Sequence, residues 1–154
     1  RDLRMSRGLG DVYKRQAVRD AFDRFDGQFE QIPPMVSAIK KDGVPLYKLA
    51  RKGQEVVREP RPVEVFGHRI TRMAIPEVDF TVQCSKGFYV RSYAYDIGKA
   101  LGCGAHLSAL RRTQSGRFTL DRAITVETLK TAPREELFRT MLSLAELAAI
   151  LIAK

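Results

Sequence analysis

The feature that most constrains the fold of this chain is a change of apolar period within residues 78–101. Residues 78–84 alternate strictly between apolar and polar types, which is the pattern of a β-strand with one buried face. From Val90 onward the apolar residues recur at helical spacing as far as Leu101, and Gly102 supplies a stop signal. The sequence therefore predicts a half-buried strand that passes almost directly into an amphipathic helix.

The junction between these two elements is the stretch SKGFYVRS, residues 85–92. Gly87 permits a backbone turn that other residues resist. Tyr89 and Arg91 are two positions apart, so on an extended backbone they would point to the same side. The guanidinium of Arg91 suits a carboxylate or a phosphate. The spacing alone leaves two interpretations open: side chains held over a cleft, or an ordinary surface turn, which is the commoner case.

The rest of the chain shows short apolar patterns of both periods, with an Asp-Gly turn signal inside residues 41–43. This mixture predicts an α+β fold with a mixed, mostly antiparallel sheet, helices packed on it and a cleft on the exposed face. We expect helices at residues 17–25, 45–51, 90–101 and 133–151, and strands at residues 35–40, 61–73, 78–84, 106–112 and 116–120. The apolar stripe of the last helix either packs in a core or connects to a further domain.

Residues 1–16 have no apolar period typical of a helix or a strand, and we exclude them from the fold. Residues 11–16, DVYKRQ, back-translate in frame to a string that resembles the end of a widely used transposon sequencing adaptor. We therefore interpret residues 1–16 as a scar of library preparation. The alternative is a genuine basic tail.

Charge and cysteine content narrow the class of protein. The formal net charge of +9 favours an anionic partner, most often nucleic acid. No apolar run reaches the roughly 18 residues of a membrane span, and we see no secretory signal. Cys84 and Cys103 are too few for a disulfide framework, which favours a reduced, cytoplasmic setting.

Three blocks of sequence resemble the TruB family of tRNA pseudouridine synthases in content, order and spacing. Blocks of this length are a far more specific signal than a lone short motif. The blocks are QIPPMVSAIK at residues 31–40 with Gly43, Leu46 and Tyr47; REPRPV at residues 58–63; and CSKGFYVR at residues 84–91, which continues through Asp96, Gly98, residues 101–107 and residues 110–112. Val36 stands where a tyrosine is commoner in the family.

The resemblance implies a reaction and roles for three residues. The family isomerises a uridine in the T-arm of tRNA to pseudouridine, without metal or organic cofactor, after flipping the base out of its stack. An aspartate acts at the bond between sugar and base. By resemblance, Arg91 pairs with that aspartate, Tyr89 lies beside the flipped base, and Leu110 forms an apolar wall of the pocket.

The resemblance also suggests where RNA is held. We expect further RNA contacts from Lys40, Tyr47, Arg61, Lys86, Arg111 and Arg112. The competing interpretation is that Lys40 is a solvated surface lysine, that Tyr47 lines the core and that Arg61 is a strand-edge arginine. A metal site built from Cys84, Cys103, His106 and His68 lacks a paired Cys-x-x-Cys spacing, so we expect no metal.

The family's aspartate lies in a Gly-His-x-Gly-x-Leu-Asp-Pro block, and no such string occurs in this sequence. Asp96 is a poor substitute because it falls on the predicted helix after the junction. We therefore expect residues 17–132 to be a partial catalytic domain, with residues 133–154 leading toward a missing RNA-binding domain. The expected chain is an inactive, monomeric fragment that contacts the T-arm stem-loop. The alternatives are a non-catalytic RNA-binding module and, less favoured, a relative that uses a guide RNA.

Overall fold

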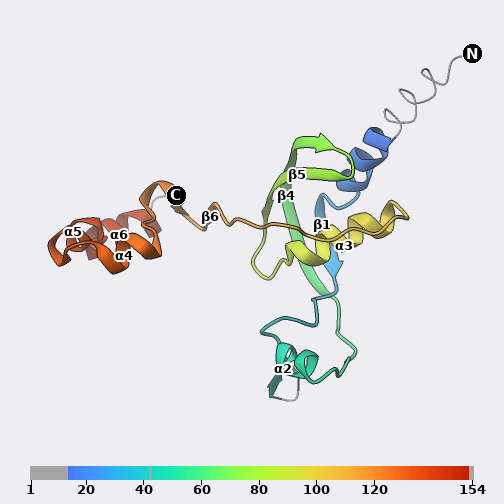
Figure 1. Cartoon of the computed structure of the whole chain (residues 1–154), viewed down its shortest axis with the longest axis horizontal. Coiled ribbons are helices and arrows are strands. Elements are labelled where there is room, and N and C mark those ends of the chain that lie inside the picture. The colour runs from blue at the N-terminus through green and yellow to red at the C-terminus, as the bar shows by residue number, and fades with distance from the viewer. Residues whose placement is uncertain (1–13, 42, 153–154) are drawn as a thin grey trace, which may run out of the picture. The chain divides into compact units, whose positions relative to one another are not determined.

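The computed structural model describes residues 14–41 and 43–152, so most of the expected adaptor scar lies outside the described residues (Figure 1). The chain divides into two compact units, residues 1–108 and residues 109–154, and each is described by itself. No helix in the described part of the chain has both the length and the apolar content that a membrane crossing requires.

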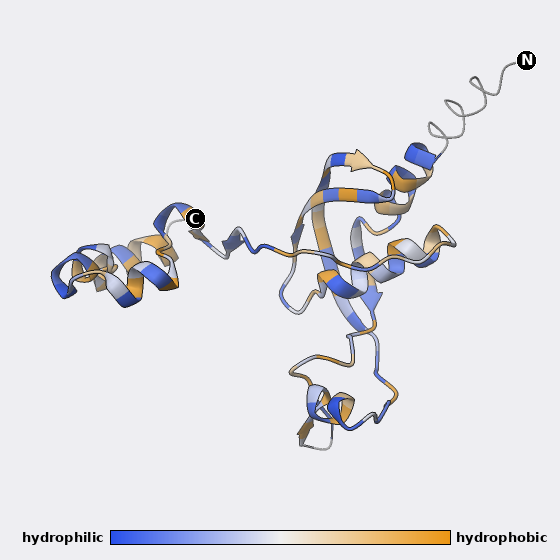
Figure 2. Cartoon of the chain, in the orientation of Figure 1, coloured by the Kyte–Doolittle hydropathy of each residue, from blue (hydrophilic) through white to orange (hydrophobic). Residues whose placement is uncertain are grey.

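The first unit is built on a three-stranded antiparallel sheet in the order β1–β4–β5. Its strands are β1 (Gly27–Gln31), β4 (Arg61–Ala74) and β5 (Glu77–Cys84). Residues of β5 alternate between half-buried and exposed as the sequence predicts, and contrasting bands of hydropathy follow the β4–β5 hairpin (Figure 2). The expected α+β architecture is confirmed for this unit.

Two helices pack on the sheet and bury the core of this unit. One covers residues 14–23 and the other is α3 (Val90–Ala100). The first begins upstream of the expected boundary, because residues 14–16 are helical and Gln16 Nε2 donates to Asp20 Oδ1 at 2.8 Å. Lys, Arg and Gln are good helix formers, so the helix propagates through them. The core cluster consists of Val18, Ala21, Phe22, Val65, Tyr93 and Ile97.

Tyr93 of α3 lies at the centre of this core with a fully buried side chain. Four phenylalanine rings surround it with centroids 5.3 to 5.9 Å away, in tilted or edge-to-face geometry: Phe22, Phe25, Phe80 and Phe88. Its hydroxyl has no hydrogen-bond partner. Burial, and then the nearby carboxylates of Asp26 and Asp23, raise the pKa of the Tyr93 phenol well above its usual range.

Between β1 and β4 the chain makes an excursion that contains a small hairpin and a short helix (Figure 1). These are β2 (Lys40–Lys41), β3 (Val44–Pro45) and α2 (Leu46–Arg51). The strand expected at residues 35–40 is wrong, since residues 35–38 form bends and only Lys40 of that range pairs.

The reason is that two carbonyl groups of this stretch serve α2 instead of a sheet. Leu46 N donates to Ile39 O at 2.7 Å, and Tyr47 N donates to Ser37 O at 3.1 Å. The first N–H groups of a helix have no partner inside the helix, so these two carbonyls satisfy them. The helix expected at residues 45–51 is present as α2, and Asp42 of the expected turn lies outside the described residues.

α3 ends as the sequence predicts, with Gly102 at φ 75°. The strand expected at residues 106–112 is wrong, because the chain there is irregular. Gly98 receives the returning loop, and its carbonyl accepts from Gly104 N at 2.9 Å. A Cβ on Gly98 would collide with the backbone of Gly104 and Ala105. The loop therefore packs on the helix rather than pairing with a strand.

The second unit contains short elements throughout. They are β6 (Gln114–Ser115), β7 (Phe118–Thr119), a 3-10 turn (Leu120–Arg122), α4 (Val126–Thr131), α5 (Arg134–Thr140) and α6 (Leu144–Ile152). The strand expected at residues 116–120 is reduced to two residues, and α4, which begins after a Thr125 cap, was not expected.

The single long helix expected from Pro133 is wrong, because the chain breaks after α5. Glu146 N donates to Ser143 Oγ at 3.2 Å, and Ser143 N donates to Glu146 Oε2 at 2.8 Å. This reciprocal capping box starts α6 as a new helix. Of the two interpretations of the apolar stripe, core packing is wrong, since Met141, Leu144 and Leu151 are exposed and none of the described residues 109–152 is buried.

Candidate active site at the junction of β5 and α3

The junction between β5 and α3 is built by Ser85 and Gly87. Ser85 N donates to Glu64 O at 2.9 Å, and Ser85 Oγ accepts from Glu64 N at 3.0 Å. The side-chain oxygen thus takes the place of a backbone carbonyl and ends the ladder with β4. Gly87 then turns the chain at φ 84°, and α3 begins at Val90.

Gln31, the last residue of β1, connects the first block of sequence to this junction. Its side chain is only 1% exposed. Tyr89 N donates to Gln31 Oε1 at 2.8 Å, and Gln31 Nε2 donates to Tyr89 O at 3.2 Å. The side-chain amide therefore binds both backbone groups of Tyr89, which is 58 positions away in the sequence.

Three further hydrogen bonds hold the backbone that follows Gln31. Ser92 Oγ donates to Ile32 O at 2.9 Å, and Arg91 Nη2 donates to Val36 O at 2.7 Å. Arg58 Nη1, from the second block, donates to Pro33 O at 3.1 Å. The structure therefore brings together parts of all three sequence blocks.

Tyr89 and Arg91 lie where the three blocks meet, but their backbone conformation differs from the expected one. Tyr89 is the N-cap residue of α3 with extended backbone, whereas Arg91 already lies in the first helical turn. The expectation that both residues share one side of an extended backbone is therefore wrong. Tyr89 is half-buried and Arg91 is exposed. Within the described residues, Arg91 forms no ion pair with a carboxylate.

The other cations expected to touch RNA in this unit are also unpaired. Lys40, Arg61 and Lys86 are exposed, and none of them forms an ion pair with a described carboxylate. Tyr47 is half-buried, with the Arg51 guanidinium 5.5 Å from the centre of its ring. Of these residues, Arg61 lines a cavity of about 270 Å³, together with Pro33, Ile39, Lys41, Leu46, Val57, Arg58 and Glu59.

Leu110, Arg111 and Arg112 belong to the second unit, in the irregular segment before β6. All three are exposed. Their expected roles as pocket wall and phosphate contacts stay predictions.

Asp96 does not supply the carboxylate that Arg91 lacks. It lies on α3 five positions after Arg91, which places it about 140° around the helix. Its side chain is half-buried, and this burial raises the pKa of the carboxyl although Lys99 opposes the shift. Asp96 therefore faces away from the Arg91 side chain.

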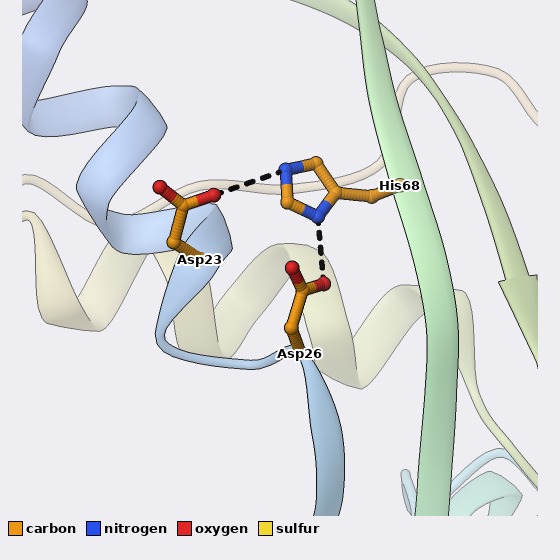
Figure 3. A group of neighbouring side chains, drawn as sticks. All are labelled: Asp23, Asp26 and His68. Carbon is orange, nitrogen blue, oxygen red and sulfur yellow. Dashed lines mark hydrogen bonds and ion pairs between the residues drawn. The ribbon is translucent and has the colours of Figure 1, made fainter.

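Asp23, Asp26 and His68 form the only described group of three side chains with metal-ligand atoms close together (Figure 3). His68 Nδ1 lies 2.7 Å from Asp26 Oδ1, and His68 Nε2 lies 3.5 Å from Asp23 Oδ1. The two carboxylates thus face opposite nitrogens of one ring, so one ion cannot bind all three groups. The imidazole instead bridges the N-terminal helix and the loop after it to β4.

Sequence reasoning did not identify Gln31 and Ser92 as parts of the site. A signal for Gln31 exists, because it shares the inward face of β1 with Phe29, whereas Gln28 and Glu30 point outward. A polar residue at an inward position needs a partner, and this strand ends just before two prolines. Ser92 carries no comparable signal.

Two family profiles match the chain. One is described as "TruB family pseudouridylate synthase (N terminal domain)" and covers residues 6–90. The chain belongs to the TruB family. The second profile, "tRNA pseudouridylate synthase B C-terminal domain", covers residues 91–150. The boundary between the two profiles falls within the first turn of α3, so TruB residues from both profiles meet at the Gln31–Tyr89–Arg91 junction.

Relatives from several bacteria agree with this assignment. The chain is 57% identical over 115 residues to a tRNA pseudouridine synthase B of Geobacter sulfurreducens, covering 75% of this chain and 38% of that protein. It is 47% identical to the enzyme of the same name from Opitutus terrae, covering 88% of this chain and 56% of that protein. The chain thus spans about two fifths to somewhat over half of these TruB relatives.

A solved structure supports the fold. The chain resembles one protein in a crystal structure of a Cbf5–Nop10–Gar1 complex with a TM-score of 0.61 and 31% identity. The match covers 81% of this chain and 35% of that chain. The expected α+β fold of pseudouridine-synthase type is confirmed.

Proposed function

We propose that this chain supplies half of the uridine site of a tRNA pseudouridine synthase. The observation that carries this proposal is the junction itself: Tyr89 and the exposed Arg91 guanidinium are held by Gln31 and Val36 of another block. Arg91 lacks a carboxylate partner among the described residues. Such an arrangement suits a site that is completed by an aspartate.

In the proposed reaction, the aspartate works at the bond between the base and the sugar of a flipped uridine. The base is detached and reattached through its C5 carbon, with release of the hydrogen at C5. Arg91 holds the aspartate ionised and oriented, because a nearby guanidinium favours the charged carboxylate. The ring of Tyr89 packs beside the base, and Leu110 contributes an apolar wall.

The substrate is the T-arm stem-loop of tRNA. Lys40, Arg61 and Lys86 hold its phosphates, and Arg111 and Arg112 add contacts from the second unit. Contacts of this kind position RNA without reading its sequence and weaken with salt. Tyr47 lies near the RNA in the same region.

The chain as it stands is inactive in this proposal, because its sequence lacks the Gly-His-x-Gly-x-Leu-Asp-Pro block. We infer a cytoplasmic, monomeric protein that needs no cofactor, with residues 17–132 as its partial catalytic domain. The alternative function is that of a non-catalytic RNA-binding module, which would not require this block.

Tritium release tests the proposal. A T-arm stem-loop carrying tritium at C5 of the target uridine is incubated with the chain in excess, and binding is measured in parallel. We expect binding without release. Release above a protein-free control would contradict the half-site, since a carboxylate of this chain would then do the chemistry. Absence of binding would contradict the proposed function itself.

A further inference from the structure

We propose that Gln31 is a positioning residue, which sets the orientation of Tyr89 and, through the first turn of α3, that of Arg91. This inference rests on the proposed function, because Tyr89 and Arg91 are the side chains that meet the uridine and the aspartate. Gln31 itself lies behind them and is 1% exposed.

The contact acts at the residue where α3 starts. Tyr89 O accepts the first hydrogen bond of the helix, from Tyr93 N at 3.0 Å, and also accepts from Gln31 Nε2 at 3.2 Å. Tyr89 N has no partner within the helix, and Gln31 Oε1 satisfies it at 2.8 Å. One planar amide therefore fixes both polar groups of the N-cap residue.

The backbone of Gln31, at the other end of this contact, belongs to the sheet. Gln31 is the last residue of β1 and pairs with Arg61 at the start of β4. The α3 N-terminus is tied to the same segment by Ser92 Oγ, which donates to Ile32 O at 2.9 Å. Two adjacent residues of the first block thus bind two residues that flank Arg91.

The chemistry of the site requires an amide in particular. Tyr89 presents one donor and one acceptor, so its partner must accept and donate at once. A glutamate at position 31 would accept from Tyr89 N when ionised but could not donate to Tyr89 O. When protonated, the same glutamate has both capacities and mimics glutamine. Burial favours the neutral form of such a carboxyl, so the switch falls above the usual range for glutamate, about 4.3.

The pH-dependent donor capacity of a glutamate at position 31 provides a test, because a residue with a merely structural role would not give a pH-dependent preference for uridine. We measure the affinity of the full chain and of Gln31→Glu for a T-arm stem-loop with the target uridine and for the same stem-loop with cytidine there. The measurements are made at pH of about 5 and about 8. The matched control is Gln28→Glu, an exposed position on the same strand.

We expect the unaltered chain and Gln28→Glu to prefer uridine at both pH values. Gln31→Glu should lose about tenfold of that preference at the higher pH, because Tyr89 O loses one of its two donors and faces a negative charge instead, and should regain it at the lower pH. Binding of the cytidine stem-loop should stay within about twofold throughout.

Two results would overturn the inference in distinguishable ways. If the unaltered chain prefers uridine and Gln31→Glu keeps that preference at both pH values, Gln31 does not position the site. If the unaltered chain shows no preference for uridine, the proposed function fails and the positioning role fails with it.

Gln31→Met provides a second variant, which should lose the preference at both pH values and speed hydrogen exchange of the Tyr89 amide. Unchanged exchange at Tyr89 would contradict the contact directly.

Discussion

The guanidinium of Arg91 donates a hydrogen bond to the backbone carbonyl of Val36, with Nη2 and the oxygen 2.7 Å apart. The two residues are 55 positions apart in the sequence. Arg91 uses only this one donor in the described structure, so the rest of its planar fork is free for a carboxylate or a phosphate. The residue therefore links the first block of the chain to the junction and still presents its charge.

Arg91→Lys should separate these two tasks. Lysine keeps the charge but lacks the planar fork that binds Val36 O, so overall RNA binding should persist while the first block is held less firmly beside Tyr89 and the preference for uridine over cytidine at the target position falls about tenfold. Because Arg91 is exposed, the free energy of unfolding should change by less than about 1 kcal/mol. Fluorescence polarisation measures the binding of the two stem-loops, and urea unfolding measures the free energy of unfolding. The control Arg69→Lys, exposed on β4, should leave both unchanged, and an equal loss in both variants would refute a special role for Arg91.

Tyr93→Phe should not destabilise the first unit at neutral pH. The hydroxyl is buried without a partner, so its removal should leave the free energy of unfolding unchanged or raise it by about 1 kcal/mol. Thermal and urea unfolding measure this difference. Tyr95→Phe, an exposed position on the same helix, is the control. A loss of stability at neutral pH in Tyr93→Phe alone would mean that the hydroxyl has a partner.

The same residue makes stability depend on pH in the alkaline range. The pKa of Tyr93 in the folded chain is raised above its usual value of 10.0. Its contribution to stability is therefore full below pH 10 and is lost as the pH rises further, because only the unfolded chain then releases the proton. We expect Tyr93→Phe to unfold at higher pH than the parent in an alkaline titration followed by circular dichroism.

Gly98→Ala should destabilise the first unit by about 1 to 3 kcal/mol, because the added methyl group overlaps the backbone of the returning loop. The matched control is Gly67→Ala on β4, where a Cβ meets nothing within 4 Å. Urea unfolding of the two variants makes the comparison. If both lose the same stability, the close approach of the loop to α3 is refuted.

The Asp23–His68–Asp26 group should behave as a hydrogen-bonded bridge and not as a metal site. Zinc or EDTA should shift the melting temperature of the parent by no more than the error of the measurement, since one ion cannot reach all three groups. Asp26→Asn should lower it in both conditions, because the carboxylate at 2.7 Å from His68 loses its charge. A zinc-dependent rise in the parent that Asp26→Asn abolishes would contradict this interpretation.

The apolar periods of the sequence predicted α3 and two strands of the sheet, β4 and β5, whereas β1 was not expected. At β5 and α3 the period matches the burial, and tertiary contacts reinforce it. The apolar periods predicted strands wrongly where a short segment has no neighbouring strand to pair with. Residues 35–38 form no strand, because Ser37 O accepts from Tyr47 N of α2 and Val36 O accepts from Arg91, and residues 106–112 find no strand to pair with. Such outcomes depend on contacts between distant segments, which local pattern does not contain.

The site was partly predictable for a similar reason. The resemblance pointed to Tyr89 and Arg91, and the structure brings both to the first block. The buried partners that hold them were not found, because the contact of Gln31 with Tyr89 spans 58 positions and exists only once β1 and α3 are in place. Leu110, Arg111 and Arg112 lie in the other unit, and their roles in the proposed site stay predictions.

Photocrosslinking tests the central claim most directly. A T-arm stem-loop with 4-thiouridine at the target position is irradiated with the full chain, and the crosslinked peptide is mapped by mass spectrometry. The proposed half-site predicts a crosslink within residues 87–91, centred on Tyr89, that excess unlabelled stem-loop removes. Crosslinks confined to the β4–β5 turn or to helices α4, α5 and α6 would contradict the claim that the junction of β5 and α3 receives the uridine.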